Sequence, residues 1–365
     1  MILKSIDIEN FRNIERASLE FGEKLNLVYG PNASGKTSLL EAIFFLLTGR
    51  SIRGARESLL IKKEHDYSRL VGDIITADED IKIEIGFDGK GKKNIKIDGV
   101  LLQRLSKLIE ISAVVSVSSE DVEIASGPPD NRRRFMDSVL SHCFPVYLSS
   151  LMEYGKTLKQ KNALLKDSPR IDKSQINIWN KQLAKTGSTL VNKRLDFVQY
   201  LKAQGAGLYK RLSPDEEIKF VYKTRYGDEF ENDIIKGIFD ALNDNLQREI
   251  RLQQAIVGPH RDDISIHVDG KSIRSYGSRG QQKCAMLSMK FASLEYMENI
   301  RGEKPLLLLD EAVSELDTGR SANLLTLSKS IGQVLMASAR GIERTEDDGK
   351  TLRFRIEQGR IERVM

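Results

Sequence analysis

A glycine-rich motif near the N-terminus constrains the fold of this chain more than any other feature. Its eight residues match the pattern G-x-x-x-x-G-K-[ST] in full: Gly30, Pro31, Asn32, Ala33, Ser34, Gly35, Lys36 and Thr37. The apolar run 25–29 precedes the motif and the apolar run 38–48 follows it, as a buried strand and a buried helix would. In such a loop the backbone N–H groups face phosphate oxygens, the lysine reaches the β- and γ-phosphates, and the threonine hydroxyl ligates Mg²⁺. The motif therefore predicts an α/β P-loop fold with a site for ATP and Mg²⁺.

Two acidic residues follow a second apolar run, at 306–309. A buried strand that ends in adjacent carboxylates, here Asp310 and Glu311, suits metal-assisted phosphoryl chemistry. We predict that Asp310 binds Mg²⁺ together with Thr37, and that Glu311 orients or deprotonates the attacking water. Lys36, Asp310 and Glu311 are thus the predicted catalytic residues. Two surface acids are the alternative, which the phosphate loop and the sequence SELD at 314–317 both disfavour.

A second anion-binding device begins about 240 residues after the phosphate loop. Residues 276–282 (YGSRGQQ) precede an amphipathic run that is typical of a helix. Serine followed by glycine at a helix start exposes a hydroxyl and backbone N–H groups, both of which bind anions. One nucleotide needs only one phosphate loop, so this second device requires an explanation. An ordinary helix N-cap at Ser278 is the simplest one.

The rest of the chain separates into a strand-rich part and a helix-rich part. Residues 73–100 alternate between polar and apolar around the turn DGKGK, which predicts a β-hairpin. From about 132 to 212, and from about 232 to 255, apolar residues recur at three- and four-residue steps, as in helices. We predict that residues 1–115 and 300–365 form a phosphate-loop lobe. Residues 116–299 would form an inserted helix-rich lobe that carries the segment 276–282.

Composition limits where this protein works and what it binds. No run approaches the roughly 18 apolar residues of a membrane helix, and the two cysteines, Cys143 and Cys284, form no CxxC pair. These features predict a cytoplasmic protein without a zinc site. The formal net charge of +5 is compatible with a polyanionic partner. The candidate DNA contacts are two arginine clusters: Arg132, Arg133, Arg134, Arg53 and Arg56. Solvated helix faces that pair with acids are the alternative.

The segment 258–263 (GPHRDD) lies shortly before the second anion-binding device. A lone histidine is usually structural, so we expect His260 to pack rather than to catalyse. Arg261 and Asp262 are predicted to form an ion pair that orders the loop. Because this loop leads into 276–282, we also consider that it couples DNA contact to the ATP site.

The order of these motifs resembles that of an ATP-binding-cassette (ABC) ATPase head. The opening IDIENFRNI resembles the structural-maintenance-of-chromosomes branch of such heads. Within that branch the chain is similar to the RecF family of bacterial DNA replication and repair proteins, through SGPPDNRRRFMD, VGPHRDD and YGSRGQQK. The resemblance implies an ABC-type head with an inserted helix-rich lobe and no long coiled coil. It also implies a homodimer in which Ser278, Gly280 and Gln281 of one copy cap the ATP bound by the other.

The same resemblance implies an ATP-dependent clamp for single- and double-stranded DNA at gaps or junctions. Such a clamp would work in the nucleoid during the SOS response to DNA damage, and would help RecR and RecO to load a recombinase. Its ATPase activity would be weak and stimulated by DNA, because Ser338 ends a strand after which no switch histidine follows. The Q-loop glutamine is also absent, and Ser119, Glu120 or Asp121 stands in its place. An ATPase subunit of a membrane transporter and a non-hydrolysing ATP-binding scaffold remain the alternatives.

Overall fold

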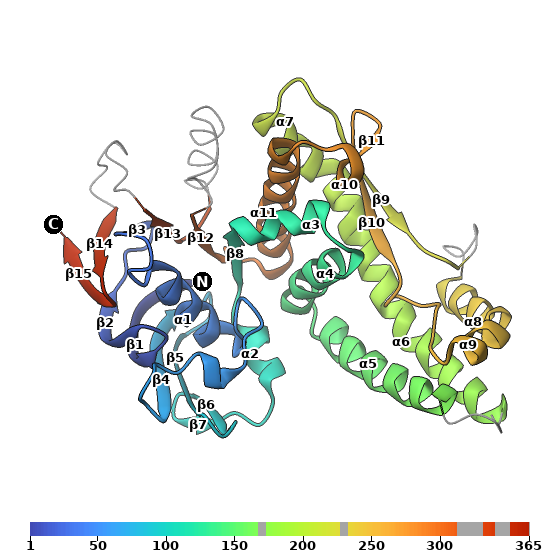
Figure 1. Ribbon diagram of the computed structural model, residues 1–365, viewed down its shortest axis with the longest axis horizontal. Coiled ribbons are helices and arrows are strands. Elements are labelled where there is room, and N and C mark those ends of the chain that lie inside the picture. Colours follow the sequence, from blue (N-terminus) through green and yellow to red (C-terminus); the bar gives the residue numbers. More distant parts are fainter. Residues whose placement is uncertain (167–172, 227–232, 312–330, 340–350, 365) are drawn as a thin grey trace. The chain divides into compact units, whose positions relative to one another are not determined.

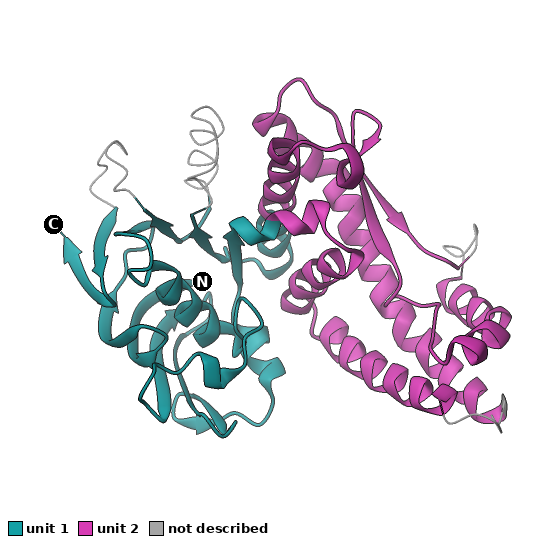
Figure 2. Cartoon of the chain, in the orientation of Figure 1, with its two compact units in different colours: residues 1–121, 293–365 teal, residues 122–292 magenta. Residues whose placement is uncertain are grey.

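The computed structural model, drawn in Figure 1, describes five stretches of the chain: residues 1–166, 173–226, 233–311, 331–339 and 351–364. The predicted SELD sequence at 314–317 lies outside these described residues. The chain divides into two units (Figure 2). Unit 1 consists of residues 1–121 and 293–365, and unit 2 of residues 122–292. A helix-rich segment is thus inserted into a unit that is built from both ends of the chain.

The boundaries between the units differ from the expected lobe boundaries. The expected boundary at 115/116 would cut β8 (Val114–Ser118), whose ladder with β12 (Leu306–Asp310) keeps the whole strand in unit 1. The expected boundary at 299/300 lies near the end of α11 (Arg279–Arg301), and this helix instead contributes residues to both units. Apolar periodicity continues through such a helix, so the sequence pattern gives no sign of where the units divide.

Unit 1 contains two six-stranded sheets. The first is antiparallel throughout and has the order β2 (Ile14–Glu20), β1 (Ile2–Phe11), β4 (Tyr67–Ile75), β5 (Asp80–Asp88), β6 (Lys93–Ile97), β7 (Val100–Leu101). The second has the order β15 (Arg360–Val364), β14 (Leu352–Glu357), β3 (Leu25–Tyr29), β13 (Val334–Ser338), β12, β8. From β14 to β8 the neighbours are parallel, whereas β15 pairs antiparallel with β14. The predicted hairpin is confirmed as the β5–β6 pair, and the apolar runs that end at Asp310 and Ser338 are confirmed as parallel strands.

Helix α1 (Lys36–Thr48) forms the centre of the core of unit 1 and contacts strands of both sheets. Ten of its 13 residues are buried, because its sequence is apolar on nearly every side. The ring of Phe45 lies among those of Phe11 and Phe87, with centroids 6.2 Å and 5.0 Å away. Gly49 ends the helix with φ +65°, a backbone conformation that favours glycine. A helix held on both sides in this way fixes the position of the phosphate loop that precedes it.

The remaining short elements of unit 1 are η1 (Glu57–Leu59), α2 (Leu105–Ile111) and, at its border, η2 (Ser119–Val122).

Unit 2 is mainly helical. Its helices are α3 (Glu123–Ser126), α4 (Pro129–Cys143), α5 (Pro145–Lys166), α6 (Lys173–Tyr200), the π-turn η3 (Leu201–Gly205), α7 (Ala206–Leu212), α8 (Ile234–Asp244), α9 (Leu246–Leu252), α10 (Ile273–Tyr276) and most of α11. A three-stranded antiparallel sheet has the order β11 (Lys271–Ser272), β10 (Asp263–Val268), β9 (Ile218–Lys223). The predicted helical stretches are therefore confirmed within the described residues. Among those residues, no helix combines the length and the hydropathy that a membrane span requires.

A buried arginine joins three segments of unit 2. Arg194 of α6 donates hydrogen bonds to Tyr147 Oη (3.0 Å), Asp137 Oδ1 (2.8 Å) and the carbonyl oxygen of Pro259 (2.6 Å). Desolvation of this guanidinium would be costly without such partners. The three bonds therefore tie α4, α5 and the 258–263 loop to the long helix α6.

Candidate nucleotide-binding site

Four parallel strands of unit 1 end at the same edge of the second sheet. The strand ends Tyr29 of β3, Ser338 of β13, Asp310 of β12 and Ser118 of β8 follow one another across this edge. Ligands of α/β proteins bind at the carboxyl ends of parallel strands. The segments that continue from these ends are the phosphate loop, Glu311 and η2. The sheet therefore gathers all the nucleotide-site residues that the sequence predicts within unit 1.

The phosphate loop curls around its own lysine. Lys36 is buried, and its Nζ donates to the carbonyl oxygens of Gly30 (2.9 Å) and Pro31 (2.8 Å). Gly30 packs against β14 so closely that a Cβ there would lie 2.1 Å from the carbonyl oxygen of Ile356. Gly35 adopts φ +119°, which L side chains rarely allow. Both motif glycines are thus required by the fold of the loop as well as by its approach to phosphate.

Two buried oxygens beside the loop lack hydrogen-bond partners among the described residues. They are Ser34 Oγ within the loop and Asn13 Oδ1 in the β1–β2 turn. Asn13 Nδ2 donates to the carbonyl oxygen of Ser34 (3.1 Å), and Gly359 N donates to the same oxygen (2.8 Å). Buried polar atoms in folded proteins are nearly always paired, so an unpaired hydroxyl in a phosphate loop fits a missing anionic ligand. Asn13 and Gly359 position the loop but were not predicted; the only sequence signal for Asn13 is its place in the opening IDIENFRNI.

A hydroxyl and a carboxylate meet at the end of β12. Thr37 Oγ1 donates to Asp310 Oδ1 over 3.1 Å, although the two residues are 273 positions apart. Burial raises the pKa of Asp310, against the hydrogen bond from Thr37 and the charges of Arg53 and Lys36, which lower it. Two hard oxygen ligands at this separation fit Mg²⁺, which uses one or two protein oxygens beside those of phosphates and water. The site thus has the donor set for the predicted metal.

Glu311 extends from the strand end toward the phosphate loop. Its backbone has φ +51°, and its N–H donates to the carbonyl oxygen of Ala337 (3.2 Å). Its Oε1 lies 3.8 Å from Lys36 Nζ, while 42% of the side chain is exposed. A non-glycine residue in the left-handed region is uncommon and often marks a functional site. The carboxylate is therefore held beside the phosphate loop yet open to solvent, as a water-orienting group must be.

Arg53, which the sequence assigns to DNA contact, lies at the rim of the same site. Its Nη2 is 3.5 Å from Glu120 Oε1, and its charge is one of those that act on Asp310. Glu120 is one of the three candidates for the Q-loop position, and a second, Asp121, instead accepts from Ser118 N (2.8 Å). Nothing in the spacing of Arg53 distinguishes it from Arg56, and both side chains are exposed. Only the fold separates the two arginines.

The segment 276–282 lies in unit 2, at the start of α11. Ser278 Oγ accepts from Gln281 N (3.2 Å), and Ser278 N donates to Gln281 Oε1 (2.9 Å), which is a reciprocal capping box. Gln281 Nε2 also donates to Glu216 Oε1 (2.9 Å). Ser278 is exposed, and 76% of the neighbouring Tyr276 is exposed as well. The N-cap alternative is thus present in the structure, and it leaves the serine on the surface.

The arginine cluster on α4 does not form one surface. Arg132 is only 3% exposed; its Nε and Nη2 bind the carboxylate of Asp263 (2.7 Å and 3.0 Å), and its Nη1 donates to the carbonyl oxygen of Gly127 (3.0 Å). The prediction that Arg132 contacts DNA is therefore wrong, because the side chain ties α4 to β10. Arg133 is largely buried and binds Asp130 and the carbonyl oxygen of Asp262. Arg134 is exposed.

The predicted ion pair in the 258–263 loop is also wrong. Asp262 is buried and accepts hydrogen bonds from Tyr222 Oη (2.7 Å) and Tyr226 Oη (2.6 Å), whereas Arg261 is exposed and donates to the carbonyl oxygen of Ala255 (3.2 Å). Burial raises the pKa of Asp262 to about 6. Two tyrosines 36 and 40 residues away give no local signal of this pairing.

His260, in the same loop, is packed as expected. Its Nδ1 lies 2.7 Å from Tyr154 Oη and its Nε2 lies 3.2 Å from the carbonyl oxygen of Ala255. Burial lowers the pKa of His260 to about 4, so the ring is neutral at physiological pH. A neutral, enclosed imidazole has a structural role here.

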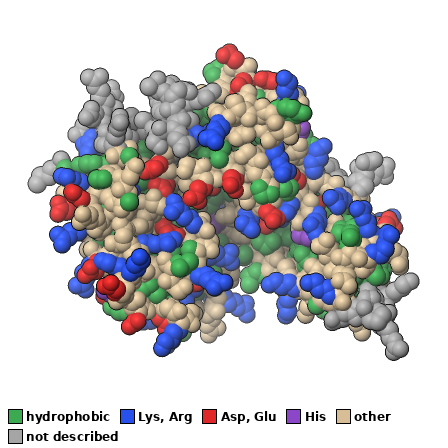
Figure 3. All heavy atoms as spheres, in the orientation of Figure 1, with side chains coloured by type: hydrophobic (Ala, Val, Ile, Leu, Met, Phe, Trp, Pro, Cys, Tyr) green, Lys and Arg blue, Asp and Glu red, His purple; other side chains and the backbone are tan. Residues whose placement is uncertain are grey.

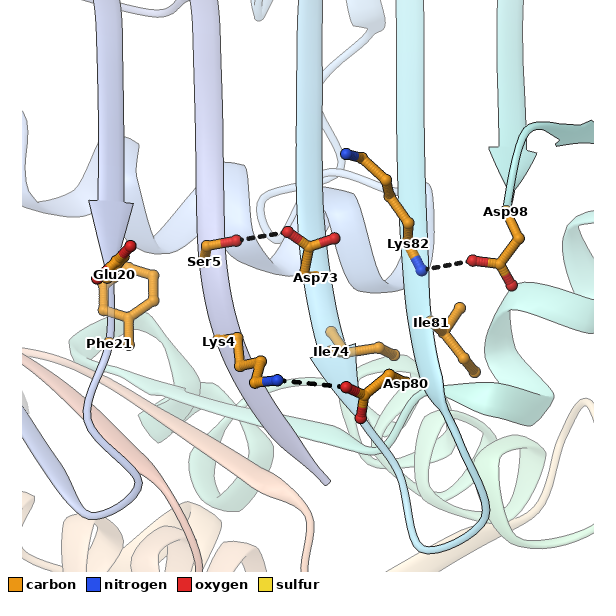
Figure 4. Close-up of a pocket in the computed structure, with 10 residues that line it drawn as sticks. All are labelled: Lys4, Ser5, Glu20, Phe21, Asp73, Ile74, Asp80, Ile81, Lys82 and Asp98. Carbon is orange, nitrogen blue, oxygen red and sulfur yellow. Dashed lines mark hydrogen bonds and ion pairs between the residues drawn. The ribbon is translucent and has the colours of Figure 1, made fainter.

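A separate hollow of about 570 Å³ lies on the antiparallel sheet of unit 1 (Figure 4). Several of its polar groups are paired: Lys4 with Asp80 (3.2 Å), Ser5 Oγ with Asp73 (2.8 Å), and the backbone N–H of Lys82 with Asp98 (2.8 Å). The side chains of Glu20 and Lys82 form no ion pair among the described residues. Because most of its polar groups are already paired, this hollow offers less to a ligand than the nucleotide site does. The nucleotide site therefore remains the candidate site of unit 1.

Comparison with known proteins gives consistent results over the full length. Residues 2–353 match the RecF/RecN/SMC N-terminal domain family. The chain is 36% identical over 370 residues to the DNA replication and repair protein RecF of Lachnoclostridium phytofermentans, covering 100% of this chain and 98% of that protein. It is 34% identical over 363 residues to the protein of the same name from Clostridium acetobutylicum, covering 99% of each.

Solved structures show the same similarity. The chain superposes on the recombination mediator protein RecF with ATP, of the RecFOR pathway, with a TM-score of 0.92 and 33% identity, over 100% of this chain and 98% of that one. An SMC head bound to the winged-helix domain of ScpA is similar in fold alone, with a TM-score of 0.59 and 15% identity over 100% and 97% of the two chains. The fold is thus that of an SMC-type ATPase head, and the described residues include no long coiled coil.

Proposed function

The chain belongs to the RecF/RecN/SMC N-terminal domain family, and within it to the RecF proteins of DNA replication and repair; on that premise we propose that it is an ATP-dependent DNA clamp. The observation that carries this proposal is the contact between Thr37 and Asp310, which joins the phosphate loop to the acidic strand end. The contact brings a hydroxyl and a carboxylate together at the end of the phosphate loop, where both oxygens could hold the Mg²⁺ of a bound nucleotide. The clamp would close when ATP binds and open after hydrolysis.

Each residue of the site has a defined part in hydrolysis. Lys36, now held by two loop carbonyls, would turn to the β- and γ-phosphates. Thr37 and Asp310 would hold Mg²⁺, which when bound neutralises charge that develops on the phosphates. Glu311 would accept a proton from the attacking water or orient it, since its carboxylate is exposed beside Lys36.

We propose slow turnover because the strand end next to the phosphate loop carries a hydroxyl. Ser338 lies in register with Tyr29, the residue that directly precedes the loop. A serine hydroxyl can donate one hydrogen bond to the γ-phosphate but cannot supply the positive charge of a histidine. Weak hydrolysis, stimulated by DNA, suits a switch whose ATP-bound state must persist.

Closure of the site requires a second copy of the chain in this proposal. Ser278, Gly280 and Gln281 would cap the ATP bound by the partner, which the exposed position of Ser278 and the half-buried positions of Gly280 and Gln281 at the start of a 23-residue helix permit. In the reciprocal cap Ser278 Oγ only accepts a hydrogen bond, from Gln281 N, so its O–H could still donate to a phosphate while the cap persists. The proposed homodimer thus adds a hydrogen bond across the interface to the one within the chain.

DNA binding is supported by the distribution of charge between the units. Unit 2 carries 28 Lys and Arg against 20 Asp and Glu, a formal charge of +8, whereas unit 1 carries 29 against 32, a charge of −3. Figure 3 shows Lys and Arg side chains spread over unit 2. Binding to single- and double-stranded DNA at gaps or junctions in the nucleoid, and recombinase loading with RecR and RecO, are proposed from the RecFOR pathway named for the similar structure. Arg134 and Arg56 remain candidate contacts.

Sedimentation velocity of the purified protein with ATP, Mg²⁺ and duplex DNA tests this proposal. We expect an ATP-dependent dimer that co-sediments with DNA, and loss of the dimer in both Lys36→Met and Ser278→Arg. Glu311→Gln should retain the dimer but release phosphate at least roughly 100-fold more slowly, since it removes the water-orienting carboxylate. A protein that binds ATP but stays monomeric under all conditions would contradict the clamp.

Two other functions predict different outcomes of the same experiment. A non-hydrolysing ATP-binding scaffold would dimerise but release no phosphate, with parent and Glu311→Gln indistinguishable. A transporter ATPase would show no response to DNA and would need a membrane partner.

A further inference from the structure

Four lysines lie close together on two neighbouring helices of unit 2. Lys156 and Lys159 are three residues apart on α5, and Lys181 and Lys185 are four residues apart on α6, so each pair shares one side of its helix. All four side chains are exposed, and within the described part of the chain none of them forms a side-chain hydrogen bond or an ion pair. We call this group the α5–α6 lysine face.

The helices α5 and α6 pack antiparallel. Tyr147, near the start of α5, meets Arg194 near the end of α6. Glu153, farther along α5, meets Gln182, which lies earlier on α6. Glu153 and Gln182 therefore mark the seam where the two helices touch.

The four lysines point to the same side of this seam. Lys156 lies three residues after Glu153, and Lys185 lies three residues after Gln182. A step of three residues turns an α-helix by 300°, which is 60° backward. Because the helices run in opposite directions, equal steps turn toward the same side of the pair. Lys159 lies six residues after Glu153, and Lys181 lies one residue before Gln182. The same rotation per residue places both of them on this side of the pair, farther from the seam.

The face carries a net positive charge, because its four lysines surround a single exposed carboxylate, that of Glu153. Together α5 and α6 carry nine Lys and Arg but only two acids, Glu153 and Asp196. Three of the nine basic residues have acidic partners: Lys161 pairs with Glu249, Lys193 with Asp196, and Arg194 with Asp137. The lysine face has none, so its potential extends into solvent.

The dimensions of the face suit a nucleic-acid backbone. Lys159 lies six residues beyond Glu153 in one direction along the helix pair, and Lys185 lies three residues beyond Gln182 in the other direction. The two lysines are therefore nine residues apart along the pair, which is roughly 14 Å at 1.5 Å per residue. A duplex of that length presents roughly eight phosphate charges. Exposed apolar side chains are few: Met152 (64%) and Ile178 (63%) stand singly among the lysines, which is normal for a protein surface. Charge, rather than apolar area, is therefore what this face offers a partner.

From these observations we propose that the α5–α6 lysine face binds the phosphate backbone of DNA. The inference rests on the proposed DNA-binding function and assigns a surface to it. Lysines hold phosphates as point charges and do not read bases, so this contact is independent of sequence. In unit 2 the lysine face takes the place of buried Arg132 and stands beside exposed Arg134 as a candidate DNA contact.

The test compares two double variants with the same change in charge. Lys156→Glu/Lys181→Glu alters the face, and Lys90→Glu/Lys92→Glu alters two exposed lysines in the β5–β6 turn of unit 1. Binding of the full-length protein to a fluorescein-labelled duplex, with ATP and Mg²⁺, is measured by anisotropy over a range of salt concentrations. For the face variant we expect affinity to fall roughly tenfold and the slope of log K against log salt to decrease by about 2. Nucleotide binding and ATP-dependent dimerisation should be unchanged in both variants.

Equal loss of affinity in the two variants, or none in either, would overturn the lysine face as the DNA contact while leaving DNA binding itself intact. A parent protein that binds no duplex at any salt concentration would instead contradict the proposed function. A third variant, Met152→Ser/Ile178→Ser, separates a protein partner from DNA. If this variant alone lost binding to RecR or RecO while the lysine variants kept full DNA affinity, the face would be a protein-docking surface and the inference would be wrong.

Discussion

At the residue scale, burial sets the protonation states of two neighbouring side chains in the 258–263 loop. His260 has its pKa lowered by burial to about 4 from 6.5, and Asp262 has its pKa raised by burial to about 6 from 3.8. As the pH falls below 6.5, the unfolded chain protonates the histidine before the folded chain does, so stability is lost. As the pH falls through 6, the folded chain protonates the aspartate first, so stability is gained. The two effects oppose each other between about pH 4 and pH 6.

We therefore expect His260→Gln and Asp262→Asn to change acid stability in opposite directions. When the pH falls from neutral to about 4.5, the unfolding free energy of His260→Gln should fall by roughly 2 kcal/mol less than that of the parent protein. The unfolding free energy of Asp262→Asn should fall by roughly 2 kcal/mol more than that of the parent. Urea denaturation of parent and variants at both pH values measures the difference. Identical pH profiles for all three proteins would show that neither group is displaced from its ordinary pKa.

The arginines of α4 give a second prediction at this scale. Arg132→Gln should lower the free energy of unfolding by on the order of 3 kcal/mol, because the carboxylate of Asp263 loses its partner in a partly buried position. Arg134→Gln, two residues away in the same helix, should change it by less than about 0.5 kcal/mol, since this side chain is exposed. Urea denaturation compares the two. A stable Arg132→Gln protein with weakened DNA binding would restore Arg132 as a DNA contact.

At the scale of elements, polar contacts between distant segments hold unit 2 together. Lys161 of α5 and Glu249 of α9 are both 0% exposed, and Lys161 Nζ lies 2.6 Å from Glu249 Oε2. Burial lowers the pKa of Lys161, while attraction to Glu249 opposes the shift. Glu249 Oε1 also accepts from Ile256 N (2.9 Å), so the pair joins α5, α9 and the segment that leads into the 258–263 loop.

Removal of one member of this pair should cost far more than replacement of both. We expect Lys161→Met to lower the free energy of unfolding by roughly 3–5 kcal/mol, because Glu249 is left buried and unpaired. Lys161→Met/Glu249→Gln removes the charge and keeps an oxygen for Ile256 N–H, so most of that loss should be recovered. Thermal or urea unfolding of the parent, both single variants and the double variant completes the cycle. A double variant no more stable than Lys161→Met would mean that the charge of Glu249 is not the cause.

At the scale of the whole molecule, chemistry and charge are divided between the units. The phosphate loop, Asp310 and Glu311 lie in unit 1, which is slightly acidic, whereas Ser278 and the lysine face lie in unit 2, which is basic. In the proposed clamp, ATP is therefore bound by one unit and capped by the other unit of a second copy. This division makes the two units respond separately to nucleotide.

Amide hydrogen exchange, measured with and without nucleotide, should show how each unit responds to ATP. With ATP and Mg²⁺, we expect slower exchange in residues 30–37 and 306–311 of unit 1 and in residues 276–282 of unit 2. In Ser278→Arg the protection of unit 1 should persist, because ATP still binds, but the protection of 276–282 should disappear with the dimer. Protection of 276–282 that survives in this variant would contradict capping by a second copy.

The sequence by itself determined the parts of this protein that depend on local order. The phosphate loop, the β5–β6 hairpin, the strands that end at Asp310 and Ser338, and most of the helices follow from spacing and periodicity within a few residues. The predicted ATP residues of unit 1 also meet as expected, because parallel strands that end in functional residues bring them to one edge of a sheet.

Only the tertiary structure decided which charged residues are available. Arg132 and Asp263 are 131 residues apart, and three adjacent arginines read alike in the sequence although one is buried, one is largely buried and one is exposed. Arg53 and Arg56 are both exposed, yet only Arg53 forms an ion pair with Glu120 and lies close enough to act on Asp310. Burial and pairing depend on neighbours that distant segments supply, and no local pattern records them. For that reason the meeting of Lys36, Thr37, Asp310 and Glu311 at one sheet edge could be predicted from the sequence, whereas the surface proposed for DNA emerged only from the packing of α5 against α6.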